Sequence, residues 1–294
     1  MSKQSSASKI KLNGFNDLFG MTDSDNLKTD VRDVMLDDLY PFEGHPFKVQ
    51  DDARMEELVA SIKEHGVLVP GIARIRSKGG YEIIAGHSRK RACELAGLTT
   101  IPMYIRNLTD DLATIVMVDS NIQREDVLPS EKARAYKMKY DAIKHQGKKG
   151  NSLLTMGEES GESAKVIQRF IWLSRLSDEL LKFVDEKFLG FTQGVDISFL
   201  KKKEQEWIYA VIEKLHINIS TKQSGELKKA SQSGSLTEAK VWEILSPVTE
   251  NKKKRKVTIK SERLDTYFPD NYSEEDIEKV IITLLDKWKA ESEG

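Results

Sequence analysis

The apolar positions of the first hundred residues switch between helical and strand spacing. Helical spacing predicts a helix from about Asp52 to Glu64 that ends at Gly66, and it is carried by Met55, Leu58, Val59 and Ile62. Two stretches with strand character follow, at residues 72–75 and 81–85, with a glycine-containing turn at 78–80 between them. The pattern therefore predicts a small α/β unit.

The strand at 81–85 is interrupted by Gly86, after which a helix is predicted from Ser88 to Ala96. A strand, a glycine turn and a helix N-terminus together present free backbone N–H groups and a positive dipole end, which suit a phosphate group. The residues of this turn that we take as candidate ligands are Gly86, His87, Ser88, Arg89, Lys90 and Arg91.

The arginines of this turn would add charge and forked donors to a phosphate site. Residues 89 and 91 of a helix are about 200° apart around its axis, so Arg89 and Arg91 are not expected to share one ligand atom. We expect Arg89, which is nearer the glycine, to be the contact. The alternative is a solvated basic first turn, although positive charge there opposes the helix dipole.

The pattern beyond residue 102 predicts a short strand at 103–105 and then helices, one of which starts at Pro129 and continues to about His145. A helix-turn-helix is predicted near residues 153–173, with a short first helix at 156–160 and a second helix from Ser163 to Leu173. The second helix has Ile167, Phe170 and Ile171 facing inward, and Lys165, Gln168, Arg169 and Trp172 on its other face.

Lysine, glutamine and arginine near a helix start are residue types that reach phosphates and base edges in a DNA major groove. The DNA-binding candidates are Ser163, Lys165, Gln168 and Arg169. The alternative for this face is an ordinary solvated polar surface.

Composition limits the remaining choices. The 294 residues carry a formal net charge of −1, so a nucleic-acid binder of this composition must gather its basic residues into patches. The single cysteine, Cys93, excludes an internal disulfide and a multi-cysteine metal site. No stretch has the length and hydrophobicity of a membrane span, and the N-terminus lacks the apolar core of a signal peptide, so we expect a cytoplasmic protein.

Three motifs, in order along the chain, resemble the signatures of the ParB partition family. The first is Gly66 with Pro70 four residues later, and the second is the run from Gly86 to Ala92. The third is Asn121 followed by Arg124, where Ser120 departs from the glutamate of the family pattern. Because His87 and Ser88 depart as well, the resemblance is closer to partition proteins of plasmids or mobile elements.

This resemblance implies an α+β protein with a small ParB/sulfiredoxin-like N-terminal domain and an all-helical DNA-binding region. The implied organisation is a disordered leader at 1–29, a nucleotide-binding domain at 30–108, a helical DNA-binding domain at 109–245, a basic linker at 246–258 and a C-terminal helical segment at 259–294. The helical spacing of the C-terminal segment predicts an apolar helix face that either dimerises or docks on the preceding helices.

The resemblance also implies ligands and partners. CTP would be bound through Gly66, Pro70, the Gly86 turn, Asn121 and Arg124, with Mg²⁺ at Asn121. No catalytic residue is firm, and Asn121 and Glu125 are the candidates for a weak CTP hydrolysis. The expected partners are double-stranded DNA with a centromere-like site, a ParA-type ATPase and a second copy of the chain, which places the protein on the nucleoid or a plasmid.

Two other functions stay open. The chain would also suit a DNA-binding transcriptional regulator that uses the ParB fold without nucleotide switching. An enzyme related to sulfiredoxin would need a cysteine in the glycine turn, where this chain has His87, and Cys93 is more simply a small buried residue. A kinase acting on free serine is a further enzyme of the same fold, and the DNA-reading helix argues against it.

Overall fold

The computed structural model describes residues 31–124, 126–146, 152–246, 264, 266–269 and 271–292. The chain divides into two units, residues 1–246 and 247–294, which are described separately. The expected leader at 1–29, the linker residues 247–258 and the candidate residue Glu125 lie outside the described residues.

A five-stranded mixed sheet forms the N-terminal part of the first unit. Its strands are β1 (Val31–Met35), β2 (Leu39–Tyr40), β3 (Gly71–Ile75), β4 (Tyr81–Ala85) and β5 (Thr100–Ile105), with a 3₁₀ turn, η1 (Leu36–Asp38), between β1 and β2. The order is β1-β5-β3-β4-β2, and β3 pairs with β4 in antiparallel and with β5 in parallel fashion. The strands expected from the sequence at 72–75, 81–85 and 103–105 are confirmed within β3, β4 and β5.

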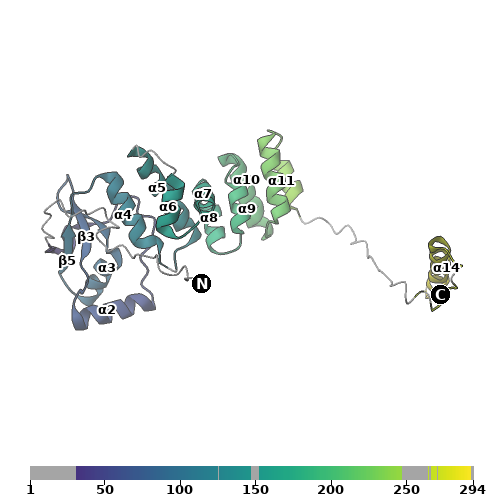
Figure 1. The fold of residues 1–294 in the computed structure, drawn as a ribbon, viewed down its shortest axis with the longest axis horizontal. Helices are drawn as coiled ribbons and strands as arrows, with labels where there is room; N and C mark the ends of the chain where they lie inside the picture. The colour runs from purple at the N-terminus through teal and green to yellow at the C-terminus, as the bar shows by residue number, and fades with distance from the viewer. Residues whose placement is uncertain are drawn as a thin grey trace, which may run out of the picture. The chain divides into compact units, whose positions relative to one another are not determined.

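Neighbouring residues of β4 point into different cores, as alternation along a strand requires. Ile83 belongs to a cluster that includes side chains from α2 (Ala53–His65) and α3 (His87–Ala96), which lie beside the strands in Figure 1. Asp52 caps α2 by accepting a hydrogen bond from the Met55 N–H at 3.0 Å. Cys93 is fully buried here, as expected, whereas Leu95 of the same helix is exposed.

Ile84 belongs to a second cluster on the other side of the sheet. This cluster joins the sheet to α4 (Asp110–Ile122), α5 (Pro129–His145), α6 (Ser152–Ser160) and α7 (Ala164–Leu173). The predicted bounds of α5 are confirmed, while α6 begins four residues earlier than the helix expected at 156–160. The predicted fold class, an α/β domain followed by helices, is confirmed.

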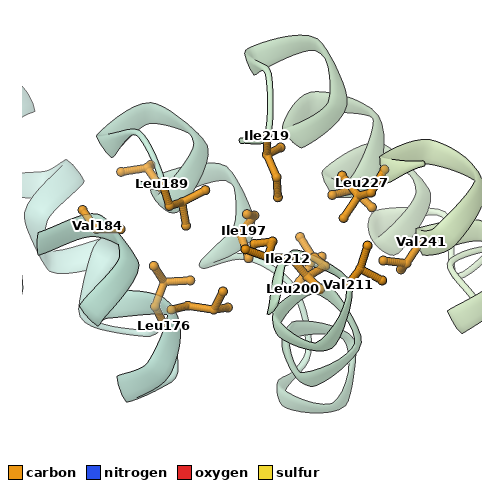
Figure 2. Packing of buried hydrophobic residues seen from close by; sticks show 14 of the residues in the cluster. Leu176, Val184, Leu189, Ile197, Leu200, Val211, Ile212, Ile219, Leu227 and Val241 are labelled. Atoms are coloured by element: carbon orange, nitrogen blue, oxygen red, sulfur yellow. The ribbon is translucent and has the colours of Figure 1, made fainter. Parts of the chain in front are cut away.

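The remainder of the first unit is helical and has its own core. The helices are α8 (Asp178–Asp185), α9 (Phe191–Ile197), α10 (Lys202–Leu215), α11 (Thr221–Gln232) and α12 (Glu238–Leu245). Figure 2 shows apolar side chains of this region pointing toward one another, among them Val184, Ile212 and Leu227, which are each at most 3% exposed.

The second unit contains α14 (Glu274–Ser292), for which Ser273 supplies the expected N-terminal cap. Its apolar face, with Leu284, Leu285 and Trp288 each more than half exposed, is uncovered. Dimerisation through this face stays a prediction. Across the described residues, no helix combines the length and hydrophobicity that a membrane crossing requires.

The close packing around Gly71 predicts a large response to an added methyl group. A Cβ atom at Gly71 would lie 2.5 Å from the Met103 sulfur and 2.9 Å from the Ala85 carbonyl oxygen. We expect Gly71→Ala to lower the free energy of unfolding by about 1–3 kcal/mol through overpacking. The matched control is Gly225→Ala in α11, where a Cβ meets nothing within 4 Å and the better helix propensity of alanine should add about 1 kcal/mol. Urea unfolding of both variants measures this, and equal effects would contradict the packing argument.

Candidate functional site

Gly86 ends β4 and begins α3 with a backbone conformation that favours glycine. Its φ is +115°, and a Cβ atom there would lie 3.2 Å from the Gly71 Cα. Since glycine has no side chain to cap the helix, the first N–H groups of α3 are left without a side-chain cap. The turn therefore has the form that a phosphate site requires.

Arg89 joins the first and second motifs. Its Nη1 donates hydrogen bonds to the carbonyl oxygens of Val69 and Pro70, the latter at 2.7 Å. Burial lowers the pKa of this guanidinium below its usual value. The loop from Gly66 to Pro70 and the Gly86 turn, expected to share a ligand, are thus in direct contact.

Lys90 and Arg91 point to other partners. Lys90 pairs with Glu94 at 2.7 Å, and Arg91 forms a two-point ion pair with Asp51 at 2.6 and 3.1 Å. This hydrogen bond from Arg91 lowers the pKa of Asp51. The structure confirms that Arg89 and Arg91 do not converge on one point.

His87 is a neutral part of this turn. Burial, with smaller effects from His45 and Lys90, lowers its pKa to about 3. Its Nε2 accepts a hydrogen bond from the Phe42 N–H at 3.4 Å, so this nitrogen carries no proton. The positive charge of the turn therefore comes from its arginines and Lys90, and His87 adds none at neutral pH.

His45 is a neighbour that the sequence patterns did not indicate. Its ring centroid lies 4.0 Å from that of His87, and its Nδ1 lies 2.7 Å from the Phe47 carbonyl oxygen. Burial and the nearby charge of Arg124 lower its pKa, and its buried Nε2 has no hydrogen-bond partner. The loop that carries His45 has neither helical nor strand spacing, so no pattern marks it.

The third motif is only partly brought to the turn. Arg124 and Ser88 line one cavity of about 460 Å³, together with residues from the start of α2. Arg124 also pairs with Asp126 at 3.2 Å. Asn121 does not line this cavity. Its side-chain amide N–H group donates to the Met117 carbonyl at 2.8 Å and to the Ser120 hydroxyl at 3.1 Å.

A larger cavity, of about 750 Å³, lies at a different place on the sheet. It is lined by residues from the end of β3 and the loop after β2, including Tyr40, Arg74 and Arg76. Arg74 is already held there by Glu82 and Asp110, each at 2.6 Å. None of the residues expected to bind nucleotide lines this larger cavity.

No cluster of three or more acidic, histidine or cysteine residues suited to a metal occurs in the part of the chain that the structure describes. Asn121 retains an amide oxygen of the kind that Mg²⁺ accepts as a ligand. A Mg²⁺ ion at Asn121 would therefore depend on further oxygen atoms supplied by a bound nucleotide.

Helices α6 and α7 form the expected pair around a turn at Gly161. A Cβ atom at Gly157 would lie 2.7 Å from the Glu162 carbonyl oxygen, so the small residue lets the two helices approach closely. Ser163 caps α7 by accepting a hydrogen bond from the Val166 N–H at 3.3 Å. Lys165, in the first turn of α7, is exposed.

The rest of the expected DNA-reading face is partly occupied by protein contacts. Arg169 donates to the Thr192 hydroxyl at 2.9 Å and lies 4.8 Å from the Phe191 ring centroid. Gln168 is half-buried. Trp172, on the same face, is half-buried, and its ring packs edge-on against Phe199 with centroids 5.1 Å apart.

The buried state of His87 predicts acid sensitivity. Since its folded pKa of about 3 lies below the usual value of 6.5, the unfolded chain alone binds this proton as the pH falls below about 6.5. At a pH of about 5, this difference in proton binding lowers the free energy of unfolding by about 2 kcal/mol. We expect His87→Gln to remove that part of the acid-induced loss, measured by urea unfolding between neutral and acidic pH.

The control for this prediction is His145→Gln, at a side chain that is 72% exposed. It should change the acid-induced loss of stability much less than His87→Gln does. An acid-induced loss in His87→Gln as large as in the wild type would show that His87 does not resist protonation.

Comparisons with known proteins show similarity to proteins of the ParB type. The family described as ParB N-terminal domain matches residues 21–122. The chain is 33% identical over 192 residues to Stage 0 sporulation protein J of Bacillus subtilis, covering 65% of each chain, so it spans slightly less than two thirds of that relative.

Two further comparisons cover a larger share of this chain and of the matched protein. The chain is 28% identical over 287 residues to a nucleoid occlusion protein of Halalkalibacterium halodurans, covering 95% of this chain and 93% of that protein. It is similar to the crystal structure of C-terminally truncated ParB from Caulobacter crescentus complexed to the centromeric parS site, with 22% identity, a TM-score of 0.43, and coverage of 67% of this chain and 98% of that one.

Proposed function

We propose that this chain is a ParB-like partition protein that acts as a CTP-dependent DNA-binding clamp and recognises a centromere-like site. The observation that carries the proposal is the meeting of motifs at the start of α3. Arg89 reaches the Pro70 carbonyl, and Ser88 lines a cavity together with Arg124. Three segments separated along the chain are thus gathered around one glycine turn.

The residues at this turn have distinct roles in the proposal. The uncapped N–H groups that follow Gly86 would bind the triphosphate, assisted by the Ser88 hydroxyl and the charge of Arg124. The loop from Gly66 to Pro70 would lie against the base and sugar, as the family resemblance implies. Lys90 and Arg91, already paired with acids, would contribute less.

Mg²⁺ and hydrolysis form a separate part of the proposal. Mg²⁺ would be held by the triphosphate oxygens and Asn121, because Ser120 supplies a hydroxyl dipole in place of a carboxylate charge. The Ser120 hydroxyl donates to the Met117 carbonyl at 2.9 Å. We therefore propose slow CTP hydrolysis, with binding retained.

DNA binding is assigned to α7. Ser163 caps the N-terminus of α7 and the exposed Lys165 lies in its first turn, where a recognition helix contacts the major groove. A homodimer formed through α14, a ParA-type ATPase partner and a location on the nucleoid or a plasmid complete the proposal, as the family resemblance implies.

A second candidate function is favoured by the state of Arg89. Because its Nη1 is satisfied by two carbonyl groups of the protein, Arg89 also suits a rigid scaffold that binds no nucleotide. In that case the chain would be a DNA-binding regulator without nucleotide switching. Nucleotide titration separates the two candidates.

Calorimetry with CTP and Mg²⁺ tests the site directly. Arg89→Ala removes a charge-assisted contact and the tie to the Gly66–Pro70 loop, so we expect a loss of about 1.5–3 kcal/mol in binding, or about ten- to a hundredfold in affinity. The matched control is Arg91→Ala, two residues along the same helix, which should lose much less. No binding of CTP to the wild type would leave only the regulator, and equal losses in both variants would contradict the assigned roles.

Selection of bound duplexes from a random-sequence library tests the DNA interface. Gln168→Ala should reduce the preference of the protein for its selected duplex by about 1–3 kcal/mol, because a base-edge contact carries sequence information. Lys165→Ala should weaken binding to all duplexes alike. The control is Lys182→Ala on α8, also a highly exposed lysine, which should change neither quantity. Failure to select any sequence, or an unchanged preference in Gln168→Ala, would refute the role of α7.

A further inference from the structure

The cavity of about 750 Å³ described above has no role in the proposed function. Its wall includes Tyr40 of β2, Arg74 of β3 and Glu82 near the start of β4, so it lies at the opposite end of β4 from the Gly86 turn. Its volume is within the range of small-molecule sites, about 300–1,000 Å³. A ligand in this cavity would therefore be separate from a nucleotide at the Gly86 turn.

The charges that line the cavity are partly matched within the protein. Arg74 pairs with two carboxylates of the lining, each at 2.6 Å. The charged groups that remain are Arg76 and Lys78, which are positive, and Glu43, which is negative. In the described part of the chain, no carboxylate forms an ion pair with either of these two cations. The unmatched charge of the cavity is therefore positive and favours an anionic ligand.

Arg76 is held in place by an aromatic ring. Its guanidinium carbon lies 3.8 Å from the centroid of the Tyr40 ring. The turn after Arg76 packs against the same ring, since the Arg76 backbone N–H donates to the Gly80 carbonyl at 3.0 Å and a Cβ atom at Gly80 would lie 2.7 Å from the ring. A guanidinium stacked in this way keeps its forked N–H donors available for a carboxylate or a phosphate group.

Other lining residues complete a site for a small organic anion. Ser77 and Lys78 follow Arg76 in the turn and line the same cavity, where they offer a hydroxyl and an ammonium group as donors. Pro41 and Leu108 also line it and offer apolar surface to a carbon skeleton. A few polar groups on a partly apolar wall are typical of small-molecule sites. Two unmatched cations can pair with both charges of a dianion.

We propose that this cavity is a second ligand site, which binds a small organic dianion through the guanidinium fork of Arg76 and the ammonium group of Lys78. A phosphate monoester and a dicarboxylate share the required chemistry, namely oxygen atoms that carry two negative charges on a small carbon skeleton. The inference goes beyond the proposed function and does not depend on it, because none of the residues expected to bind CTP lines the cavity.

Titration of the full chain with phenyl phosphate and, separately, with phthalate tests the proposal in the absence of CTP. Both probes have a phenyl skeleton and carry about two negative charges at neutral pH. In the wild type, calorimetry should detect binding of at least one probe, and NMR should show shifts of the backbone amides at 41–44 and 76–80. Arg76→Gln should weaken this binding by about ten- to a hundredfold, as expected for the loss of a charge-assisted hydrogen bond. Phthalamide, which lacks the charges, should not bind.

The matched control is Arg106→Gln. Arg106 also lies over a tyrosine ring, with its guanidinium carbon 5.5 Å from the Tyr104 centroid, but it does not line the cavity. Its replacement should leave the affinity for the probe as in the wild type. Lys78→Gln, at an exposed side chain, covers the case in which Arg76→Gln does not fold, and it should also weaken binding.

The outcomes identify the ligand class or overturn the proposal. Binding of phenyl phosphate alone would assign a phosphate monoester, and binding of phthalate alone a dicarboxylate. The proposal is overturned if neither probe shifts the amides at 76–80, if the shifts are confined to the Gly86 turn, or if Arg76→Gln and Arg106→Gln lose equally. Since no CTP is present, such a failure leaves the proposed function intact, whereas failure of the proposed function is seen only in the CTP titration.

Discussion

The close approach of two backbone segments, at Gly71 and Gly86, determines the geometry of the candidate nucleotide site. A Cβ atom on either glycine would lie within 3.2 Å of a neighbouring atom, and the conformation of Gly86 disfavours other residues. This contact sets the start of α3 against the loop that ends at Pro70. From this position Arg89 reaches the carbonyl oxygens of that loop.

The same turn is connected to α7, the proposed DNA-reading helix, through one continuous core. Ile84, two residues before Gly86, packs in the cluster that also contains Met117 of α4, Tyr136 of α5 and Ile167 of α7. A close-packed interior deforms little. A displacement therefore passes through it mainly when whole helices or strands move. A nucleotide-dependent change near Gly86 is therefore placed to affect α7 through α4 and α5. In the same region, Lys139 of α5 forms ion pairs with Asp119 of α4 and Glu159 of α6, each at 2.5 Å.

The sequence predicted the parts of the fold in which spacing and backbone constraints agree. α5 was predicted at both ends, because Pro129 suits a helix start and the apolar stripe continues for the full length. β1 was not predicted, since only Val34 of its five residues is buried and no alternation is visible. The lowered pKa of His87 was not predicted, because the burial that causes it depends on contacts with distant segments, such as the ring of His45.

In the candidate site, too, contacts between distant parts of the chain could not be predicted from local spacing. Local motifs identified Gly86, Arg89 and Arg124, but pairing within the fold decides which of their atoms remain available. Arg91 is engaged by Asp51, forty residues earlier in the chain, and no local pattern predicts such a contact. Likewise, the contact of Trp172 with Phe199, a residue of a later segment, is not visible in the spacing of its own helix.

Amide hydrogen exchange of the intact chain, with and without CTP and Mg²⁺, tests the central claim most directly. The account predicts slower exchange at the N–H groups that follow Gly86 and in the loop from Gly66 to Pro70, where ligand and protein would replace solvent. Unchanged exchange at these positions would contradict it. So would protection confined to the larger cavity at Tyr40 and Arg76, since that would place the nucleotide away from every motif that led to the proposal.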